Sequence, residues 1–185
     1  MNEAMPVLSE TAAALRREFD RSFASAPITE IARLENMLAV RVGGDAYAIR
    51  VAEIGGMYAD RRIVPLPSAM PSLLGMTGFR GQLAPVYDLA VLLGYPPRTA
   101  ARWLVLVRGR HSVALAFDTF EAQLVVPPER VVALSAAGNE PASRPHVRGA
   151  VAQGDGSVRP VLDLPSVLGD IQQRVEATHL SMKER

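Results

Sequence analysis

Alternating hydrophobic and polar positions run through two separate stretches of the chain, residues 38–51 and 103–117. A period of two places successive side chains on opposite faces of a strand, which is typical of half-buried β-structure. The alternation is interrupted at Gly43-Gly44-Asp45 in the first stretch and at Gly109-Arg110 in the second, and both are turn-forming sequences. Each stretch is therefore predicted to form a β-hairpin, and the two hairpins match at an offset of 66 residues.

A second duplication accompanies the hairpins. Residues 81–94 and 156–169 are identical at seven of 14 aligned positions, at an offset of 75 residues. Each copy predicts a strand followed by a helix of one or two turns, with an aspartate where the helix begins and a glycine just beyond its end. We therefore expect four shared residues to be structural caps: Asp88, Gly94, Asp163 and Gly169. Pro85 and Pro160 lie inside the two strands, which predicts edge or bulge positions for them.

The order of these elements predicts a mainly β protein with two similar subdomains. The chain gives a hairpin, a proline-containing connection and a strand with a short helix, and then repeats that order. Small barrels are the natural arrangement of so few short strands, since closure removes exposed sheet edges. A parallel sheet is not expected, because no helix of about 10–15 residues separates the strands.

The two ends of the chain have a helical periodicity instead. Residues 8–23 place apolar side chains at steps of three and four, which predicts an amphipathic helix that ends before Pro27. This helix either packs on its own domain or serves as a partner-binding arm. A weaker helical pattern spans residues 170–184. The expected domains are a helical extension over 1–36, a duplicated β-domain over 37–169 and a helical tail over 170–185.

Composition excludes several classes of protein. The 185 residues include no cysteine, which excludes disulfide scaffolds, zinc ribbons and thiol catalysis. Lys and Arg number 20 against 19 Asp and Glu, so the net charge of +1 differs from that of a typical nucleic-acid-binding protein. No apolar run approaches the roughly 20 residues of a membrane span, and the first residues have no signal-peptide pattern. We expect a cytoplasmic protein that neither binds nucleic acid nor inserts into a membrane.

Residues with catalytic potential do not form a known motif. The three histidines, at positions 111, 146 and 179, are too far apart for a helical metal pair. Neither a serine-nucleophile elbow nor a phosphate-binding loop is present. We therefore expect no catalytic residue, no cofactor and no metal. The alternative from another class is a small hydrolase or ligand-binding barrel that uses Asp88, Asp163 and His146.

The region 37–169 resembles the CheW-like domain of bacterial chemosensory coupling proteins. Three segments carry the resemblance, namely 37–58, 64–94 and 103–126. The middle segment is the most specific, because it matches the family's arginine–glycine turn and the proline–valine–x–aspartate–leucine strand that follows. The matching residues are Arg80, Gly81, Pro85, Val86, Asp88 and Leu89. The family's usual asparagine before leucine–arginine–glycine is replaced by Gly78.

The resemblance implies a fold of two pseudosymmetric five-stranded, SH3-like barrels and a non-enzymatic role as an adaptor. Members of the family link the cytoplasmic tip of a methyl-accepting chemoreceptor to the regulatory domain of a CheA-type histidine kinase. The matching positions imply that six residues lie in the kinase-binding or receptor-binding surfaces: Glu53, Ile54, Gly75, Met76, Phe79 and Arg80. The alternative role is an intramolecular salt bridge for Arg80 and a solvated carboxylate for Glu53. The alternative function is a divergent relative that binds the kinase or another regulator without receptor coupling.

Overall fold

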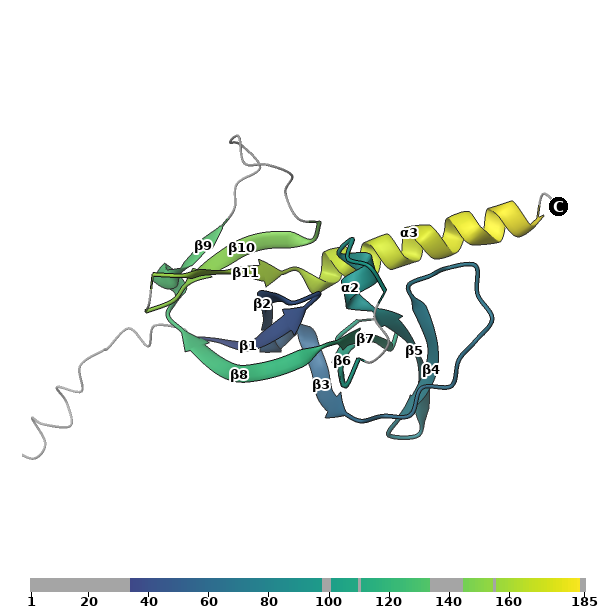
Figure 1. Ribbon diagram of the computed structural model, residues 1–185, viewed down its shortest axis with the longest axis horizontal. Helices are drawn as coiled ribbons and strands as arrows, with labels where there is room; N and C mark the ends of the chain where they lie inside the picture. Colours follow the sequence, from purple (N-terminus) through teal and green to yellow (C-terminus); the bar gives the residue numbers. More distant parts are fainter. Residues whose placement is uncertain (1–33, 98–100, 110, 134–144, 155, 184–185) are drawn as a thin grey trace, which may run out of the picture. The chain divides into compact units, whose positions relative to one another are not determined.

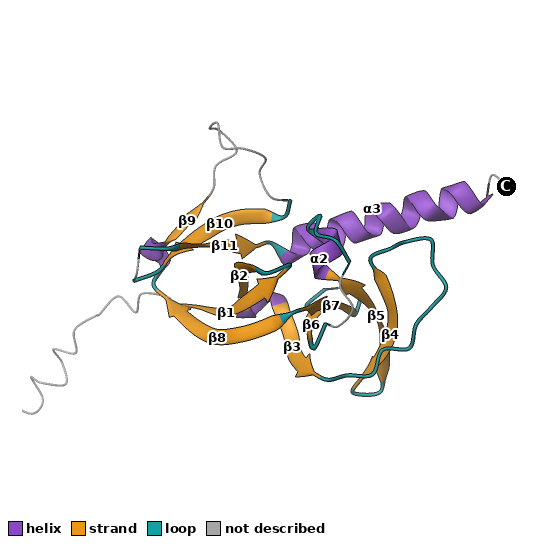
Figure 2. Cartoon of the chain, in the orientation of Figure 1, coloured by secondary structure: helices purple, strands orange, loops and turns teal. Residues whose placement is uncertain are grey.

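The computed structural model describes residues 34–183 apart from 98–100, 110, 134–144 and 155 (Figure 1). The helix expected over 8–23 lies outside the described residues. In chain order the strands are β1 (Glu35–Val42), β2 (Asp45–Arg50), β3 (Ile54–Ala59), β4 (Leu73–Phe79), β5 (Gln82–Asp88), β6 (Trp103–Val107), β7 (Val113–Phe117), β8 (Thr119–Val126), β9 (Val131–Ala133), β10 (Val147–Ala152) and β11 (Val158–Leu162). The helices are α2 (Leu89–Leu92) and α3 (Leu164–Lys183), with short 3-10 turns η1 (Val51–Glu53) and η2 (Pro128–Arg130) (Figure 2).

Both predicted hairpins are present, since β1 pairs with β2 and β6 pairs with β7 in antiparallel fashion. In the first hairpin Val42 pairs with Asp45, so Gly43 and Gly44 form a two-residue loop whose φ angles are 64° and 93°. Positive φ at both positions defines a type I′ turn, which glycine adopts without steric cost. A Cβ atom at Gly43 would also collide with the ring of Tyr95. Both the backbone conformation and the lack of space for a side chain therefore require glycine at this position.

The two halves of the domain exchange strands. The sheet of the first hairpin has the order β8-β1-β2-β11-β10-β9, and the sheet of the second has the order β3-β6-β7-β5-β4. The first five strands of one order correspond one by one to the five strands of the other. In each half, the strand after the hairpin (β3 after β2, β8 after β7) pairs with the first strand of the other hairpin (Figure 1). The predicted duplication therefore exists as two interleaved subdomains in a mainly β fold.

Each sheet contains one parallel pair, β2 with β11 and β7 with β5. The other pairs in both sheets are antiparallel, so neither is a parallel sheet, but the sequence did not reveal these two parallel pairs. Parallel neighbours need a crossover connection. The crossover from β2 to β11 passes through the whole second sheet, and the one from β5 to β7 passes through α2 and β6. Pro85 and Pro160 each lie one residue before a parallel ladder begins, so neither ladder needs the N–H group that proline lacks.

Strand pairing among the described residues does not close either sheet into a barrel, and the first sheet has six strands where five were expected. Side chains bring distant strands together instead. In the first sheet the buried Arg159 on β11 lies 2.8 Å from Glu121 on β8 and donates to the Tyr47 carbonyl oxygen at 3.2 Å. In the second sheet the rings of Tyr58 on β3 and Phe79 on β4 lie 4.7 Å apart. Because these strands are not hydrogen-bonded neighbours, both sheets must curl.

One hydrophobic core is shared by the two sheets. It contains the fully buried Tyr47 and Ile49 from the first sheet and Phe117 from the second. The first residues of the two helices, Leu89 and Leu164, are also fully buried in this core. Burial of such large side chains supplies most of the driving force for folding, so the two sheets stabilise each other.

The helix α2 is a single turn with a cap at each end. The Asp88 carboxylate accepts hydrogen bonds from the backbone N–H groups of Ala90 at 2.9 Å and Val91 at 3.4 Å. Gly94 follows the helix with a φ of 86°, the left-handed conformation of a C′ glycine. Asp88 and Gly94 thus occupy the positions that their spacing predicts.

The equivalent helix α3 is much longer, and the expectation that Gly169 ends it is wrong. The Asp163 carbonyl oxygen accepts the Val167 N–H at 3.1 Å, which places Asp163 at the start of the helix, but its carboxylate pairs with Arg148 at 2.6 Å. Ile171 lies two residues beyond the glycine and is buried in the core. Burial of that side chain outweighs the roughly 1 kcal/mol cost of a helical glycine. The helix that was expected as a separate tail is therefore continuous with the β-domain.

Candidate partner-binding site

Four of the six residues expected to contact partners lie on β4 and the turn after it: Gly75, Met76, Phe79 and Arg80. The chain segment before β4 returns alongside it, because Val64 and Met76 exchange two backbone hydrogen bonds of 2.8 and 2.9 Å. This approach requires Gly75, whose φ is 143° and where a Cβ atom would collide with the Val64 carbonyl oxygen. Gly75 therefore contributes through its backbone, by letting the preceding segment form the outer border of the sheet.

Arg80 is presented on a tight turn. Phe79 pairs with Gln82, and the φ angles of Arg80 and Gly81 are 48° and 83°, which again defines a type I′ turn. The side chain of Arg80 is exposed, and no described carboxylate forms the alternative intramolecular salt bridge with it. Phe79 is only 4% exposed and packs against Tyr58. Phe79 therefore supports the turn from inside and leaves Arg80 as the group that a partner can reach.

Glu53 and Ile54, the other two expected contacts, are turned inward. Ile54 is only 8% exposed and pairs with Val107 of β6. The Glu53 Oε2 atom accepts a hydrogen bond of 3.0 Å from the first backbone N–H of α3, that of Leu164. The Glu53 carbonyl oxygen accepts the Arg108 N–H at 2.8 Å. Glu53 lies in η1, where the chain crosses from β2 of the first sheet to β3 of the second. It connects this crossing to the start of α3, a role that differs from both a partner contact and a solvated carboxylate.

The chain crosses between the two sheets after β2 and after β7, and the carboxylates near these two crossings have similar electrostatics. Burial raises the pKa of Glu53, although the hydrogen bond from Leu164 and the charge of Arg50 favour the ionised form. Burial also raises the pKa of Asp88, and the charge of Asp118 at the second crossing raises it further. Each crossing thus brings a carboxylate close to the beginning of one helix, where the helix dipole favours negative charge.

The three residues of the hydrolase alternative do not form one site. Asp88 caps α2, which follows a strand of the second sheet. His146 and Asp163 lie just before β10 and just after β11 of the first sheet, where the Asp163 N–H donates to the His146 carbonyl oxygen at 2.9 Å. The two aspartates therefore occupy equivalent positions in different sheets, as duplicated helix starts do.

The His146 side chain attaches β10 to α3. Its Nδ1 atom lies 2.9 Å from the Ser166 hydroxyl oxygen, and its Nε2 atom lies 3.5 Å from Oδ2 of Asp170. These three residue types also form hydrolase triads, but there the hydroxyl contacts Nε2 and the carboxylate contacts Nδ1. Here Arg174 holds both oxygens of Asp170, at 2.9 and 2.8 Å. The geometry therefore fits a structural connection between a strand and a helix.

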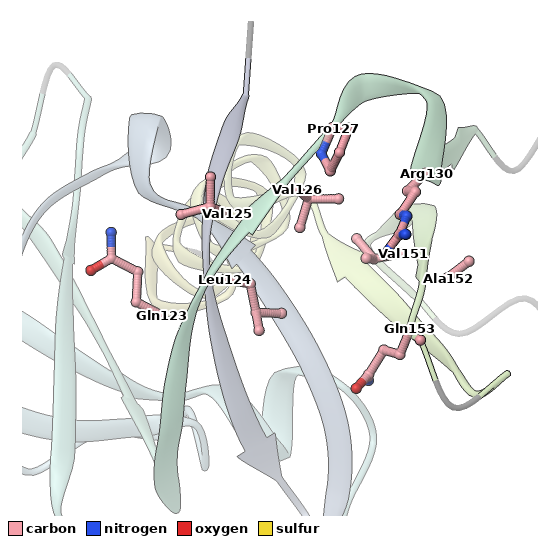
Figure 3. A pocket seen from close by; sticks show the side chains of 10 residues that line it. Gln123, Leu124, Val125, Val126, Pro127, Arg130, Val151, Ala152 and Gln153 are labelled. Atoms are coloured by element: carbon pink, nitrogen blue, oxygen red, sulfur yellow. The ribbon is translucent and has the colours of Figure 1, made fainter. Parts of the chain in front are cut away.

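Sequence reasoning missed a hollow of about 270 Å³ between β8 and β10 (Figure 3). Aliphatic side chains of Leu124, Val126 and Val151 line it, with the polar ends of Arg130 and Gln153 at one side (Figure 3). The described lining contains no histidine or carboxylate, so it lacks groups for acid–base chemistry. No group of three potential metal ligands occurs among the described residues as a whole. No periodicity could have revealed the hollow, because it forms between strands that do not pair.

Comparison with known proteins identifies first the fold and then the family. The crystal structure of the scaffolding protein TtCheW from Thermoanaerobacter tengcongensis has the same fold, with a TM-score of 0.61 at 14% sequence identity. That match covers 70% of this chain and 89% of TtCheW. The family model of the CheW-like domain matches residues 36–172. The chain therefore belongs to the CheW-like family, a family of non-enzymatic scaffolds, as its sequence predicts.

No curated protein matches the chain. Within the described part of the chain, no helix combines the length and the apolar character that crossing a membrane requires.

Proposed function

We propose that this chain is a cytoplasmic adaptor that couples a methyl-accepting chemoreceptor to a CheA-type histidine kinase. Its membership of the CheW-like family supports a scaffolding role in chemosensory signalling. The observation that carries the proposal is the exposed Arg80 on its type I′ turn. A guanidinium group can form two parallel hydrogen bonds with a carboxylate, or bind the carbonyl oxygens at the end of a helix. The turn therefore fixes the position from which the Arg80 guanidinium would make a directional contact with a partner.

The residues around Arg80 have a supporting function in this proposal. Gly75 and Met76 fix the backbone of β4, and Phe79 packs beneath the turn. In this proposal Glu53 and Ile54 act from within the fold, because Ile54 is buried and the Glu53 carboxylate accepts the Leu164 N–H, so that both position the connection between the sheets. A substitution at these inward-facing residues should reduce partner binding only as far as it disturbs the fold.

The test is binding of purified receptor cytoplasmic fragment and kinase regulatory domain from the same organism. We expect Arg80→Asp to weaken binding of at least one of them by about tenfold or more, because a lost charge pair becomes a repulsion. Arg108→Asp is the matched control, since Arg108 is also exposed but lies just after β6, outside the β4–β5 turn. Circular dichroism should show that both variants remain folded.

The same experiment separates the proposed function from its alternative. Binding of both partners, with loss on Arg80→Asp, supports receptor–kinase coupling. Binding of the kinase domain alone supports a relative that acts on the kinase without a receptor. If neither partner binds the wild-type chain, or if Arg80→Asp binds both as well as wild type does, the proposal fails.

A further inference from the structure

Three exposed arginines lie where the segment after β3 runs alongside the last part of β4: Arg61, Arg62 and Arg80. No ion pair joins any of them to a described carboxylate. Arg61 and Arg62 follow β3 and lie outside the arginine–glycine signature that contains Arg80. The chain as a whole is nearly neutral, with a net charge of +1. Three neighbouring arginines without an ion pair to a described carboxylate therefore form a local positive surface that a partner can contact.

Specific contacts place these arginines beside one another. The guanidinium carbon of Arg61 lies 5.2 Å from the centroid of the Tyr58 ring, and that ring packs against Phe79, the residue before Arg80. The Arg62 carbonyl oxygen accepts a hydrogen bond of 2.8 Å from the Thr77 hydroxyl on β4. The segment that carries Arg61 and Arg62 is therefore held against the strand that leads to Arg80.

The surroundings of the three arginines are apolar rather than acidic. Val64 is 54% exposed and Leu83 is 72% exposed, and these two residues pair with Met76 and Gly78 of β4. The nearby carboxylate of Asp60 is engaged by Arg102, with an Nε–Oδ1 distance of 3.1 Å. We call the set of Arg61, Arg62, Val64, Arg80 and Leu83 the arginine face.

We infer that the arginine face binds an acidic protein segment whose carboxylates alternate with aliphatic side chains. Guanidinium groups prefer carboxylates in bidentate geometry, and exposed Val64 and Leu83 would be covered by the aliphatic side chains of the same segment. Single-stranded nucleic acid fits less well, because it needs free aromatic faces for stacking. The Tyr58 ring is already in contact with Arg61 and Phe79. The inference does not require the partner to be a chemoreceptor.

The test uses the full chain and two synthetic helical peptides, one with glutamate and leucine at spacings of three and four and one with lysine in place of every glutamate. Fluorescence anisotropy measures binding at low and high salt. We expect the wild-type chain to bind the glutamate peptide, and the double variant Arg61→Glu with Arg62→Glu to bind it about tenfold more weakly or worse. The same variant should gain binding of the lysine peptide. High salt should weaken all of these interactions.

The matched control is the double variant Arg108→Glu with Arg130→Glu, which changes net charge equally at exposed arginines outside the arginine face. It should bind the glutamate peptide as wild type does. If the first double variant loses its fold, Arg61→Gln with Arg62→Gln replaces it and should still weaken binding.

Several results would overturn the inference. The inference fails if the wild-type chain does not bind the glutamate peptide. It also fails if the variant Arg61→Glu with Arg62→Glu binds that peptide as wild type does, or if the control variant loses as much binding. Tighter, Arg61- and Arg62-dependent binding of a single-stranded RNA or of phosphatidylserine vesicles would instead assign the face to nucleic acid or to a membrane surface.

Discussion

Glu53 is the residue at which the two sheets and α3 meet. Its carbonyl oxygen receives the Arg108 N–H and its carboxylate receives the Leu164 N–H. The first N–H groups of a helix have no acceptor within the helix, so an acceptor supplied from elsewhere in the chain stabilises both the helix and the contact. Removal of this carboxylate should therefore lower the free energy of unfolding of the whole domain, although the residue lies in a three-residue turn.

We predict that Glu53→Ala lowers the free energy of unfolding by about 1–2 kcal/mol, because it leaves the Leu164 N–H without its acceptor. Glu53→Gln should lower it less, since the amide oxygen can still accept that hydrogen bond. Urea denaturation followed by circular dichroism measures both values. Equal stability of Glu53→Ala and wild type would show that the hydrogen bond contributes nothing.

The pH dependence of Glu53 has a defined sign. Because the folded state raises the pKa of Glu53 above its ordinary value of 4.5, the folded chain retains this proton to higher pH than the unfolded chain does. The Glu53 contribution to stability therefore increases as pH falls through the raised pKa toward 4.5. Glu121 acts in the opposite direction: burial favours its neutral form, but hydrogen bonds from Arg159 and Arg41 outweigh burial and lower its pKa.

The Glu53→Gln variant isolates this contribution from the other carboxyl groups. The difference in unfolding free energy between wild type and Glu53→Gln should shift in favour of wild type as pH falls from 7 toward 4.5. Urea titrations at several pH values measure it. A difference that stays constant over this range would mean that the fold does not shift the pKa of Glu53.

At the residue scale, sequence predicts only contacts between residues that are close in the chain. The Asp88 cap is predictable because its partners are two and three residues away. The role of Glu53 is not, because its partner Leu164 is 111 residues away and no local pattern connects them. The same holds for Arg80: the family resemblance implies its arginine–glycine turn, but the absence of an ion pair with any described carboxylate depends on the surrounding fold.

At the scale of elements, α2 and α3 show how a duplicated sequence gives two different helices. Both begin after a strand whose last residues pair in parallel with a hairpin strand. One ends after a single turn at Gly94, and the other passes through the equivalent Gly169. The difference arises from residues beyond the repeat, because Ile171 is buried in the common core. Local propensity thus decides the first helix, and tertiary packing decides the second.

The two equivalent glycines should respond in opposite ways to alanine. Gly169→Ala is expected to raise the free energy of unfolding by about 0.5–1 kcal/mol, because alanine favours helix interiors. The Cβ atom at this position would have no neighbour within 4 Å. Gly94→Ala is expected to lower it by about 1 kcal/mol, because a φ of 86° strains an L-residue.

Urea midpoints of the two variants provide this comparison, and each serves as the control of the other. A loss of stability in Gly169→Ala would mean that the helix ends near that glycine, as its sequence suggests. Equal effects at both sites would contradict the distinction between a helix end and a helix interior.

At the scale of the whole molecule, the main feature is that neither sheet is built from one half of the chain. The first sheet takes β1 and β2 from the first half and β8 to β11 from the second. The second sheet takes β3 to β5 from the first half and β6 and β7 from the second. Sequence similarity reveals the duplication, but it cannot say which copy of a strand pairs with which hairpin. The connections after β2 and β7 determine this pairing, because each carries the chain from one sheet to the other.

We predict that fragments 34–97 and 101–185 do not fold separately but assemble when mixed, because each sheet needs strands from both. Near-ultraviolet circular dichroism and gel filtration measure the separate and mixed fragments. As the matched control, a cut at 138 leaves all strands of the second sheet in fragment 34–138, which should keep part of its structure alone. Independent folding of 34–97 would contradict the interleaved topology.

The interleaving also orders events during synthesis of the chain. All strands of the second sheet have been made once residue 117 is translated, whereas the first sheet awaits the end of β11 at residue 162, 45 residues later. At about 5–20 residues per second, that interval is roughly 2–9 s. The first hairpin to leave the ribosome therefore belongs to the sheet that is completed last, and its apolar face needs protection until β11 is made.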